Sequence, residues 1–251
     1  MLELRNPHSI LAAFQVRPRA VKSVTIPSHT SAAVWEDVIL QAQRNSVPVL
    51  AGEQGGRQGG GRRQRRGSPK DRGSERSSAA FALVEPPSPV PYPQLLDATG
   101  SGDPAIFLAL DQVQDPQNVG AIFRLAGFFG VRGVVMMKDR SASLTAVACD
   151  VAAGGAEHVP FSVIPNLAQA IQKAQEQDIF VIGTCERSSE SLRSVPMTGH
   201  SMLVVGNEGT GLRRLTRERC DALVAMKPLG PVPSLNVAAA TAACLAVMTN
   251  A

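Results

Sequence analysis

Three polar turns, each following an apolar or Pro/Gly-rich run, carry the side chains of this chain that could do chemistry. They span residues 111–126, 204–212 and 234–237. Their candidate functional residues are Asn118, Arg124, Glu208, Ser234 and Asn236. Amide, carboxylate, hydroxyl and guanidinium groups can orient a polar substrate and bind developing charge. The sequence therefore predicts that the three turns meet at one ligand site.

Each candidate also has an ordinary structural explanation. Glu208 can be an exposed turn acid, and Ser234 can be the N-cap of the helix that follows it. Arg124 lies among apolar residues and needs a partner or a ligand, and an ion pair with Glu157 or Glu208 would satisfy it. Asn118 and Arg124 are six residues apart on one predicted helix, so they face directions about 120° apart and need not reach the same atom.

The residues after 105 predict strands and helices in alternation. Apolar runs without a polar alternation are typical of buried parallel strands, and they cover 105–110, 134–137, 161–164, 179–183, 202–205 and 222–226. Helices are predicted at 118–129, 144–152, 167–175 and 211–219, and over the alanine-rich end of the chain. This order indicates an α/β fold, a mostly parallel sheet with helices on both faces. Ligands of such sheets bind at the carboxyl ends of strands.

The last helix is apolar nearly all round, so we expect it to be buried. Its N-terminus would then present free backbone N–H groups to a ligand.

Residues 1–84 predict a separate small α/β unit, with helices at 9–14 and 32–44 and strands at 21–26, 47–50 and 79–84. Within it, residues 52–78 form a Gly/Arg-rich insert with eight Lys or Arg against three acids. That composition does not pack into a core, so the insert is either a solvated linker or a loop that contacts RNA. Residues 85–104 begin with a proline-rich stretch and are interpreted as a linker between domains.

Several classes of protein are disfavoured. No apolar run approaches the roughly 18 residues of a membrane span, and the first residues do not resemble an export signal, so we expect a cytoplasmic protein. The four cysteines are far apart and form no C-x-x-C pair, which argues against zinc and disulfides. No P-loop is present, and the glycine pattern at 206–211 contains Glu208, which would repel a pyrophosphate. A phosphorylated cofactor is therefore disfavoured.

Taken together, the three turns resemble the three motifs of the SpoU (TrmH) family of RNA ribose 2′-O-methyltransferases. They read DQVQDPQNVGAIFRLA, VVGNEGTGL and PSLNVAAA. The resemblance covers about 105–251 and is greatest to the bacterial 23S rRNA guanosine-2′-O-methyltransferase branch. Residues 6–13 (NPHSILAA) resemble the start of that branch's small substrate-binding domain, which is similar to the ribosomal proteins L30e and L7Ae.

The resemblance implies a fold, a cofactor and a set of roles. It implies a C-terminal trefoil knot, which composition and periodicity could not show. It implies S-adenosyl-L-methionine in a pocket lined by Thr184, Gly206, Met226 and Leu235. Around that pocket it implies catalytic roles for the five polar candidates, with Arg124 as the family's arginine. It also implies a homodimer with RNA as partner, and a reaction that requires no metal.

The sequence departs from the family's pattern in two places. The family's substrate domain carries H-Q-G near its end, whereas this chain has Glu75-Arg76-Ser77-Ser78 there, so target choice can differ. The family's third motif has I-P-M-x-G before its serine, whereas this chain has Met226-Lys227-Pro228-Leu229-Gly230 with Pro231 and Pro233 added, so cofactor affinity can differ. The resemblance predicts methyl transfer to a ribose 2′-hydroxyl in RNA, with a 23S rRNA guanosine favoured over tRNA. The alternative is an RNA-binding protein without activity that acts in ribosome assembly.

Overall fold

The computed structural model describes residues 1–27, 33–52, 79–97, 104–196 and 198–249. The chain divides into two compact units, Met1–Glu85 and Pro86–Ala251. Apart from Gly52, the basic insert lies outside the described residues.

The first unit has a four-stranded sheet in the order β1-β4-β2-β3, in which β4 is antiparallel to both neighbours and β3 is parallel to β2. Its strands are β1 (Leu2–Leu4), β2 (Val21–Ile26), β3 (Val49–Ala51) and β4 (Phe81–Val84), and its helices are α1 (Pro7–Val16), η1 (Pro18–Ala20) and α2 (Ala33–Arg44). Asn6 caps α1, because its side chain accepts a hydrogen bond from the backbone N–H of His8 at 2.9 Å. The core of this unit lies between the sheet and the two longer helices, with Ile10, Val24 and Val38 fully buried.

The second unit is built on six parallel strands in the order β10-β8-β9-β5-β6-β7. The strands are β5 (Ile106–Asp111), β6 (Gly133–Met137), β7 (Phe161–Ile164), β8 (Phe180–Thr184), β9 (Ser201–Gly206) and β10 (Ala222–Val224). The predicted parallel sheet is confirmed. Both faces of the central strands are buried, which is why their sequences show no alternation.

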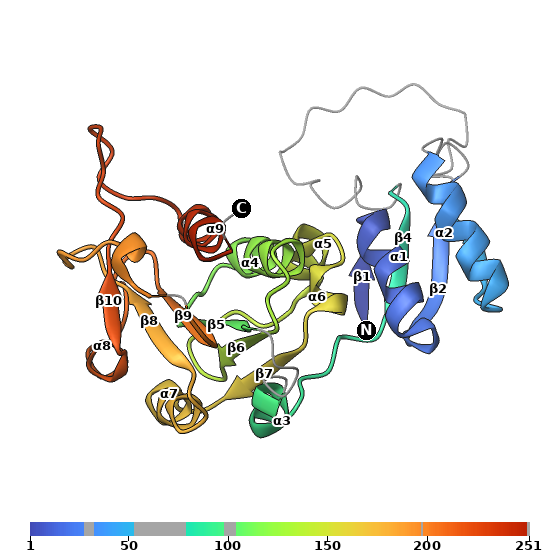
Figure 1. Cartoon of the computed structure of the whole chain (residues 1–251). Coiled ribbons are helices and arrows are strands. Elements are labelled where there is room, and N and C mark those ends of the chain that lie inside the picture. The colour runs from blue at the N-terminus through green and yellow to red at the C-terminus, as the bar shows by residue number, and fades with distance from the viewer. Residues whose placement is uncertain (28–32, 53–78, 98–103, 197, 250–251) are drawn as a thin grey trace. The chain divides into compact units, whose positions relative to one another are not determined.

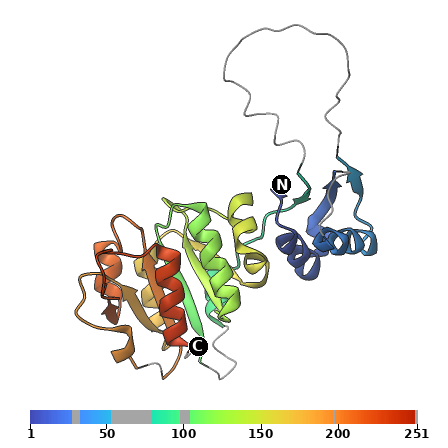
Figure 2. The ribbon, with the colours of Figure 1, turned by 90° about the horizontal axis from the view of Figure 1, so that it is seen from above.

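Helices cover both faces of this sheet, as predicted (Figure 1). They are α3 (Tyr92–Leu96), α4 (Pro116–Phe128), α5 (Ala146–Ala152), α6 (Gly155–His158), α7 (Leu167–Gln175), η4 (Leu192–Ser194), α8 (Arg214–Arg219) and α9 (Val237–Met248). In the view of Figure 1, α4, α5, α6 and α9 lie above the sheet, and α3, α7 and α8 lie below it. Figure 2 shows α9 beside α4, and these two helices are in contact.

The proline-rich segment differs from the prediction, because it is not only a linker. Its residues 92–96 form α3, whose Leu95 and Leu96 are buried in the core beneath the sheet. Tyr92 of α3 donates a hydrogen bond to the carbonyl of Ala170 at 2.8 Å, and burial raises the pKa of its phenol. Prolines are tolerated here because they stand at the first turn of the helix, where no backbone N–H is needed.

The last helix also differs from the prediction. Asn236, not Ser234, is its N-cap, and Ser234, Leu235 and Asn236 are exposed. Only one side of α9 is fully buried, through residues such as Thr241, Cys244 and Leu245. Most of the alanines of the helix lie outside this buried side and are half-buried. The apolar composition had suggested burial all round, but within this chain one side of the helix is left only partly covered.

Candidate active site

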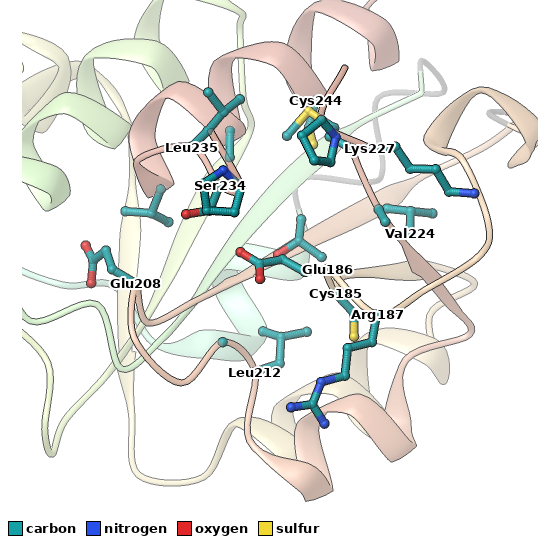
Figure 3. Close-up of a pocket in the computed structure, with 18 of the residues that line it drawn as sticks. Cys185, Glu186, Arg187, Glu208, Leu212, Val224, Lys227, Ser234, Leu235 and Cys244 are labelled. Atoms are coloured by element: carbon teal, nitrogen blue, oxygen red, sulfur yellow. The ribbon is translucent and has the colours of Figure 1, made fainter. Parts of the chain in front are cut away.

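A pocket of about 630 Å³ lies at the carboxyl ends of β8, β9 and β10 (Figure 3). Its walls come from the loop after each of these strands and from one side of α9. Volume and position are those of a small-molecule site in an open α/β sheet. The lining combines apolar side chains such as Leu212 and Val224 with five charged groups, Glu186, Arg187, Glu208, Arg217 and Lys227.

The loop of residues 207–212 holds Glu208 at this pocket. Asn207 organises the loop, because its side-chain oxygen accepts hydrogen bonds from the backbone N–H groups of Gly209 (2.9 Å) and Thr210 (3.3 Å). The Asn207 amide donates to the carbonyl of Gln112 at 3.1 Å, which attaches the loop to the end of β5. Gly206 is required by close packing, since a Cβ there would come within 2.4–2.6 Å of the backbone of Gly211 and Leu212.

The far end of the same loop is attached to β5 by an ion pair between a buried aspartate and a half-exposed arginine, which the sequence analysis missed. Asp111 is fully buried, and one carboxylate oxygen accepts from the Arg213 backbone N–H at 2.9 Å. Its other oxygen accepts from Arg213 Nε at 2.6 Å. An aspartate directly after the apolar run of β5 was the signal that could have found it, because a carboxylate buried at a strand end needs a partner.

A chain of hydrogen bonds joins the three predicted motifs. Asn118 donates from Nδ2 to Oε1 of Glu208, and Asn236 donates from Nδ2 to Oδ1 of Asn118 at 2.8 Å. Asn236 Oδ1 in turn accepts from the backbone N–H of Ala238 at 2.9 Å. The structure therefore brings Asn118, Glu208 and Asn236 together. These contacts fix the orientation of both amides.

The residues predicted to bind the cofactor fall into two groups. Thr184, Met226 and Leu235 line the pocket, as do Glu208 and Ser234. Thr184 also donates from Oγ1 to the carbonyl of Val204 at 3.2 Å, which ties β8 to β9. Gly206 does not line the pocket but lies beneath the Glu208 loop, where it allows the close packing described above.

Arg124 does not have the buried, paired side chain that its apolar neighbours had suggested. It lies on the exposed side of α4, and within the described residues it has no hydrogen bond or ion pair and does not line the pocket. Neither Glu157 nor Glu208 pairs with it. Its backbone is closely packed, because the Cα of Gly155 on α6 lies against this turn of α4. Of the five predicted polar residues, Arg124 is the one that belongs neither to the hydrogen-bond network nor to the pocket lining.

Two further findings bear on the chemistry. The described residues hold no group of three or more His, Cys, Asp or Glu side chains that could bind a metal ion. No helix among them is long and apolar enough to cross a membrane.

The fold and this site define a class of proteins. Residues 105–246 match the model of the SpoU rRNA methylase family, and the chain belongs to that family.

Relatives and solved structures agree with this assignment. A 23S rRNA (guanosine-2′-O-)-methyltransferase, RlmB, of Pseudomonas putida is 35% identical over 242 residues, which are 95% of this chain and 92% of that protein. RlmB of Escherichia coli is 44% identical over 165 residues, 66% of this chain and 68% of that protein. The crystal structure of the SpoU methyltransferase AviRb from Streptomyces viridochromogenes has a TM-score of 0.74 at 20% identity, covering 99% of this chain and 88% of that one. This last likeness concerns the fold.

Proposed function

We propose that this chain transfers the methyl group of S-adenosyl-L-methionine to the 2′-hydroxyl of a guanosine in 23S rRNA. The observation that carries the proposal is the chain of hydrogen bonds from Asn118 to Glu208 and Asn236, at the edge of a pocket of cofactor size. Membership of the SpoU rRNA methylase family supports methyl transfer to RNA. The names of the two relatives support 23S rRNA and guanosine over the alternative of tRNA.

The residues of the pocket fit S-adenosyl-L-methionine. The volume of about 630 Å³ is in the range of small-molecule sites. Apolar walls suit the adenine ring, and the carboxylates of Glu186 and Glu208 suit a ligand that carries a sulfonium and an ammonium. Thr184, Met226 and Leu235 would hold the cofactor directly, and Gly206 would keep the Glu208 loop close. When bound, the cofactor supplies a methyl group that is already strongly electrophilic.

The chain's own task is to orient the ribose hydroxyl and remove its proton. Ser234 is exposed at the pocket, and no other described residue bonds its hydroxyl, so it is available to the ribose. Glu208 is held in place by Asn118, which in turn is held by Asn236. Fixed geometry of this kind supplies much of the barrier reduction in a displacement that needs alignment. Because the 2′-hydroxyl distinguishes RNA from DNA, DNA is not a substrate.

Arg124 acts across a homodimer in this proposal. A guanidinium is poorly suited to act as a general base, so the arginine has another role. It binds a phosphate beside the target ribose and stabilises the developing alkoxide, in the pocket of the partner subunit. The hydroxyl proton passes to that phosphate or to water as the oxygen takes the methyl group, and S-adenosylhomocysteine leaves. Three observations support this: Arg124 is exposed, it is unpaired within the described residues, and it is outside its own chain's pocket. The side of α9 that is only partly covered is apolar and suits an isologous contact.

The remaining features come from the family and belong to the same proposal. Residues 1–84 form an L30e-like RNA-binding domain with the basic insert, 85–104 connect it to the methyltransferase domain 105–251, and the C-terminus is threaded into a trefoil knot. The reaction takes place in the cytoplasm and uses no metal ion.

A complementation experiment tests both the activity and the shared site. Arg124→Lys keeps the positive charge but loses the paired N–H donors of the planar guanidinium, and Glu208→Gln loses the carboxylate. We expect each variant alone to methylate unmodified 23S rRNA about 100-fold more slowly than wild type. Equal mixing with subunit exchange would restore about a quarter of the wild-type rate, because half of the dimers are mixed and each of these has one intact site.

The outcomes separate the parts of the proposal. Ribose methylation is measured by mass spectrometry of the rRNA, and cofactor binding by calorimetry. A mixture as inactive as its components would show that Arg124 and Glu208 serve the same chain. Absence of 2′-O-methylguanosine with the wild-type protein would contradict the activity itself.

A further inference from the structure

Two arginines line the pocket without belonging to the hydrogen-bond network of Asn118, Glu208 and Asn236. Arg187 belongs to the loop after β8, and Arg217 lies on α8, between the Glu208 loop and β10. In Figure 3, Glu208 and Ser234 lie at one end of the pocket, and the guanidinium of Arg187 points away from them at the other. Within the described residues, neither guanidinium has a hydrogen bond or an ion pair. Two cations of one pocket are therefore not neutralised by the chain.

The nearby acids do not neutralise them because most are engaged elsewhere. Asp111 is paired with Arg213, and Glu218 accepts from Arg214 at 2.8 and 3.1 Å. Asp221 accepts from the Val181 backbone N–H at 2.7 Å and from Gln175 at 2.8 Å.

The loop of Arg187 itself carries two further acids, Glu186 and Glu190. Figure 3 shows the carboxylate of Glu186 turned toward the Ser234 end of the pocket, away from the guanidinium of Arg187. Glu190 does not line the pocket, although its carbonyl accepts from the backbone N–H of Ala225 at 2.9 Å. The two acids of the lining, Glu186 and Glu208, thus lie toward the Ser234 end of the pocket and Arg187 lies at the other. Arg217 is a second unpaired cation of the same lining, so the part of the pocket that these two arginines line suits an anion.

The exposure of these arginines indicates which anion. Arg187 is exposed and Arg217 is half-buried, so both lie at the rim and not on a closed floor. A rim cation reaches a polyanion that crosses the mouth of the pocket, and a guanidinium fork matches the oxygens of a phosphate. We infer that Arg187 and Arg217 bind backbone phosphates of the substrate RNA and thereby hold the strand over the pocket. This inference rests on the proposed function, since it assigns a further contact to the same substrate.

The test is the salt dependence of RNA binding by the full chain. The probe is an unmethylated 23S rRNA transcript, and its affinity is measured between about 50 and 200 mM salt, the range in which lost phosphate contacts show clearly. Each of Arg187→Gln and Arg217→Gln should make the slope of log affinity against log salt shallower by about one. Arg214→Gln is the matched control, because Arg214 is on the same helix but is paired with Glu218 and does not line the pocket. Its slope should equal that of wild type.

A second measurement tests whether the arginines bind the carboxylate of the cofactor instead of RNA phosphates. S-adenosylhomocysteine binding without RNA, measured by calorimetry, should change less than twofold in both variants. Unchanged slopes in both variants would overturn the inference, and so would weaker cofactor binding with an unchanged RNA slope, which would assign the arginines to the cofactor's carboxylate. Thermal melting of each variant confirms folding. Because the slopes do not depend on turnover, they remain informative even if the wild-type protein methylates a different RNA.

Discussion

Two loops face each other across the pocket, and they are held in opposite ways. The 207–212 loop is fixed by the Asn207 side chain, by the Asp111–Arg213 pair and by close packing at Gly206. The 226–235 loop is exposed throughout, and no hydrogen bond to another described residue holds it. Leu229 at its outer part is fully exposed. Three prolines, each with its φ angle fixed by its ring, restrict this loop in place of hydrogen bonds.

The difference shows how one site can combine a rigid wall with an adaptable one. The rigid loop carries Glu208, whose position must be set before the substrate arrives. The exposed loop carries Ser234 and ends at Asn236, so the hydrogen bond from Asn236 to Asn118 is its attachment to the rigid side. Substitutions in the first loop should therefore affect folding as well as activity, and those in the second should affect activity alone.

The largest expected effect comes from removing the buried carboxylate with Asp111→Ala. This removes two charge-assisted hydrogen bonds to Arg213 and releases one end of the Glu208 loop, so we expect the free energy of unfolding of the second unit to fall by about 2–3 kcal/mol. Urea unfolding followed by circular dichroism measures it. Trp35, the chain's single tryptophan, lies in the first unit, so its fluorescence should report an unchanged unfolding transition of that unit.

Glu218→Ala is the control for this prediction, because it breaks an exposed pair with Arg214. Its cost should stay below about 0.5 kcal/mol. Equal effects of the two substitutions would show that the Asp111–Arg213 pair does not support the loop.

A smaller effect is expected from alanine at a glycine of each loop. The Cβ of Gly206→Ala would meet the backbone of Gly211 at 2.4 Å, so the backbone must shift, at a cost of about 1–3 kcal/mol. Gly230→Ala has no atom within 4 Å of its new Cβ and should leave stability unchanged. Denaturation midpoints and S-adenosylhomocysteine affinity measure both, and we expect only Gly206→Ala to weaken the cofactor. A tolerated alanine at residue 206 would contradict the close-packed description of that loop.

The smallest expected effect is a difference in reactivity among the cysteines, two of which, Cys185 and Cys244, line the pocket. Burial raises the pKa of Cys244 to about 11, and burial with Asp221 and Asp111 raises that of Cys220 to about 12. Because the thiolate is the reactive form, iodoacetamide at pH 8 should modify the half-exposed Cys185 first. S-adenosylhomocysteine should slow this reaction, since Cys185 lines the pocket. Peptide mass spectrometry reads out the order, and rapid modification of Cys244 would show that α9 leaves the sheet.

The raised pKa values of Cys220 and Cys244 make the stability of the fold depend on pH. Both thiols have folded-state pKa values above the unfolded value of about 8.5. The stability that they contribute in the protonated form is therefore complete below that pH, and it is lost as the pH rises toward 11–12.

Many strands and helices of the second unit could be predicted because the signals that define them lie within a few neighbouring residues of the sequence. Continuous apolar runs marked the parallel strands, and Asn166 marked the start of α7 with its hydrogen bond to Gln169 at 3.3 Å. β1 was missed because three residues show no period, and α6 was missed because the glycines at 154 and 155 indicate an end to a helix. α3 was missed because prolines that open a short helix have the same composition as a linker.

The site was predictable in its members but not in its geometry. Sequence order indicated that Asn118, Glu208 and Asn236 belong together, and the structure connects them. The exposure of Arg124 was missed because its apolar neighbours were considered without their helical spacing. The buried residues Val119, Ile122, Phe123 and Ala126 follow the i, i+3, i+4, i+7 pattern of one side of α4, and Arg124 is not on that side. The Asp111–Arg213 pair joins residues 102 positions apart, a separation over which local pattern carries no information.

The order of the strands has a consequence for how the protein is made. β5 lies in the middle of the sheet, yet its neighbour β9 comes much later, so that Gln112 and its partner Asn207 are 95 positions apart. At about 5–20 residues per second, a ribosome needs roughly 5–20 s to synthesise that interval. Throughout it, β5 presents an unpaired edge beside the finished β6 and β7, and such edges are prone to aggregation. The nascent chain thus has a vulnerable period that ends when β8 and β9 emerge and complete the centre of the sheet.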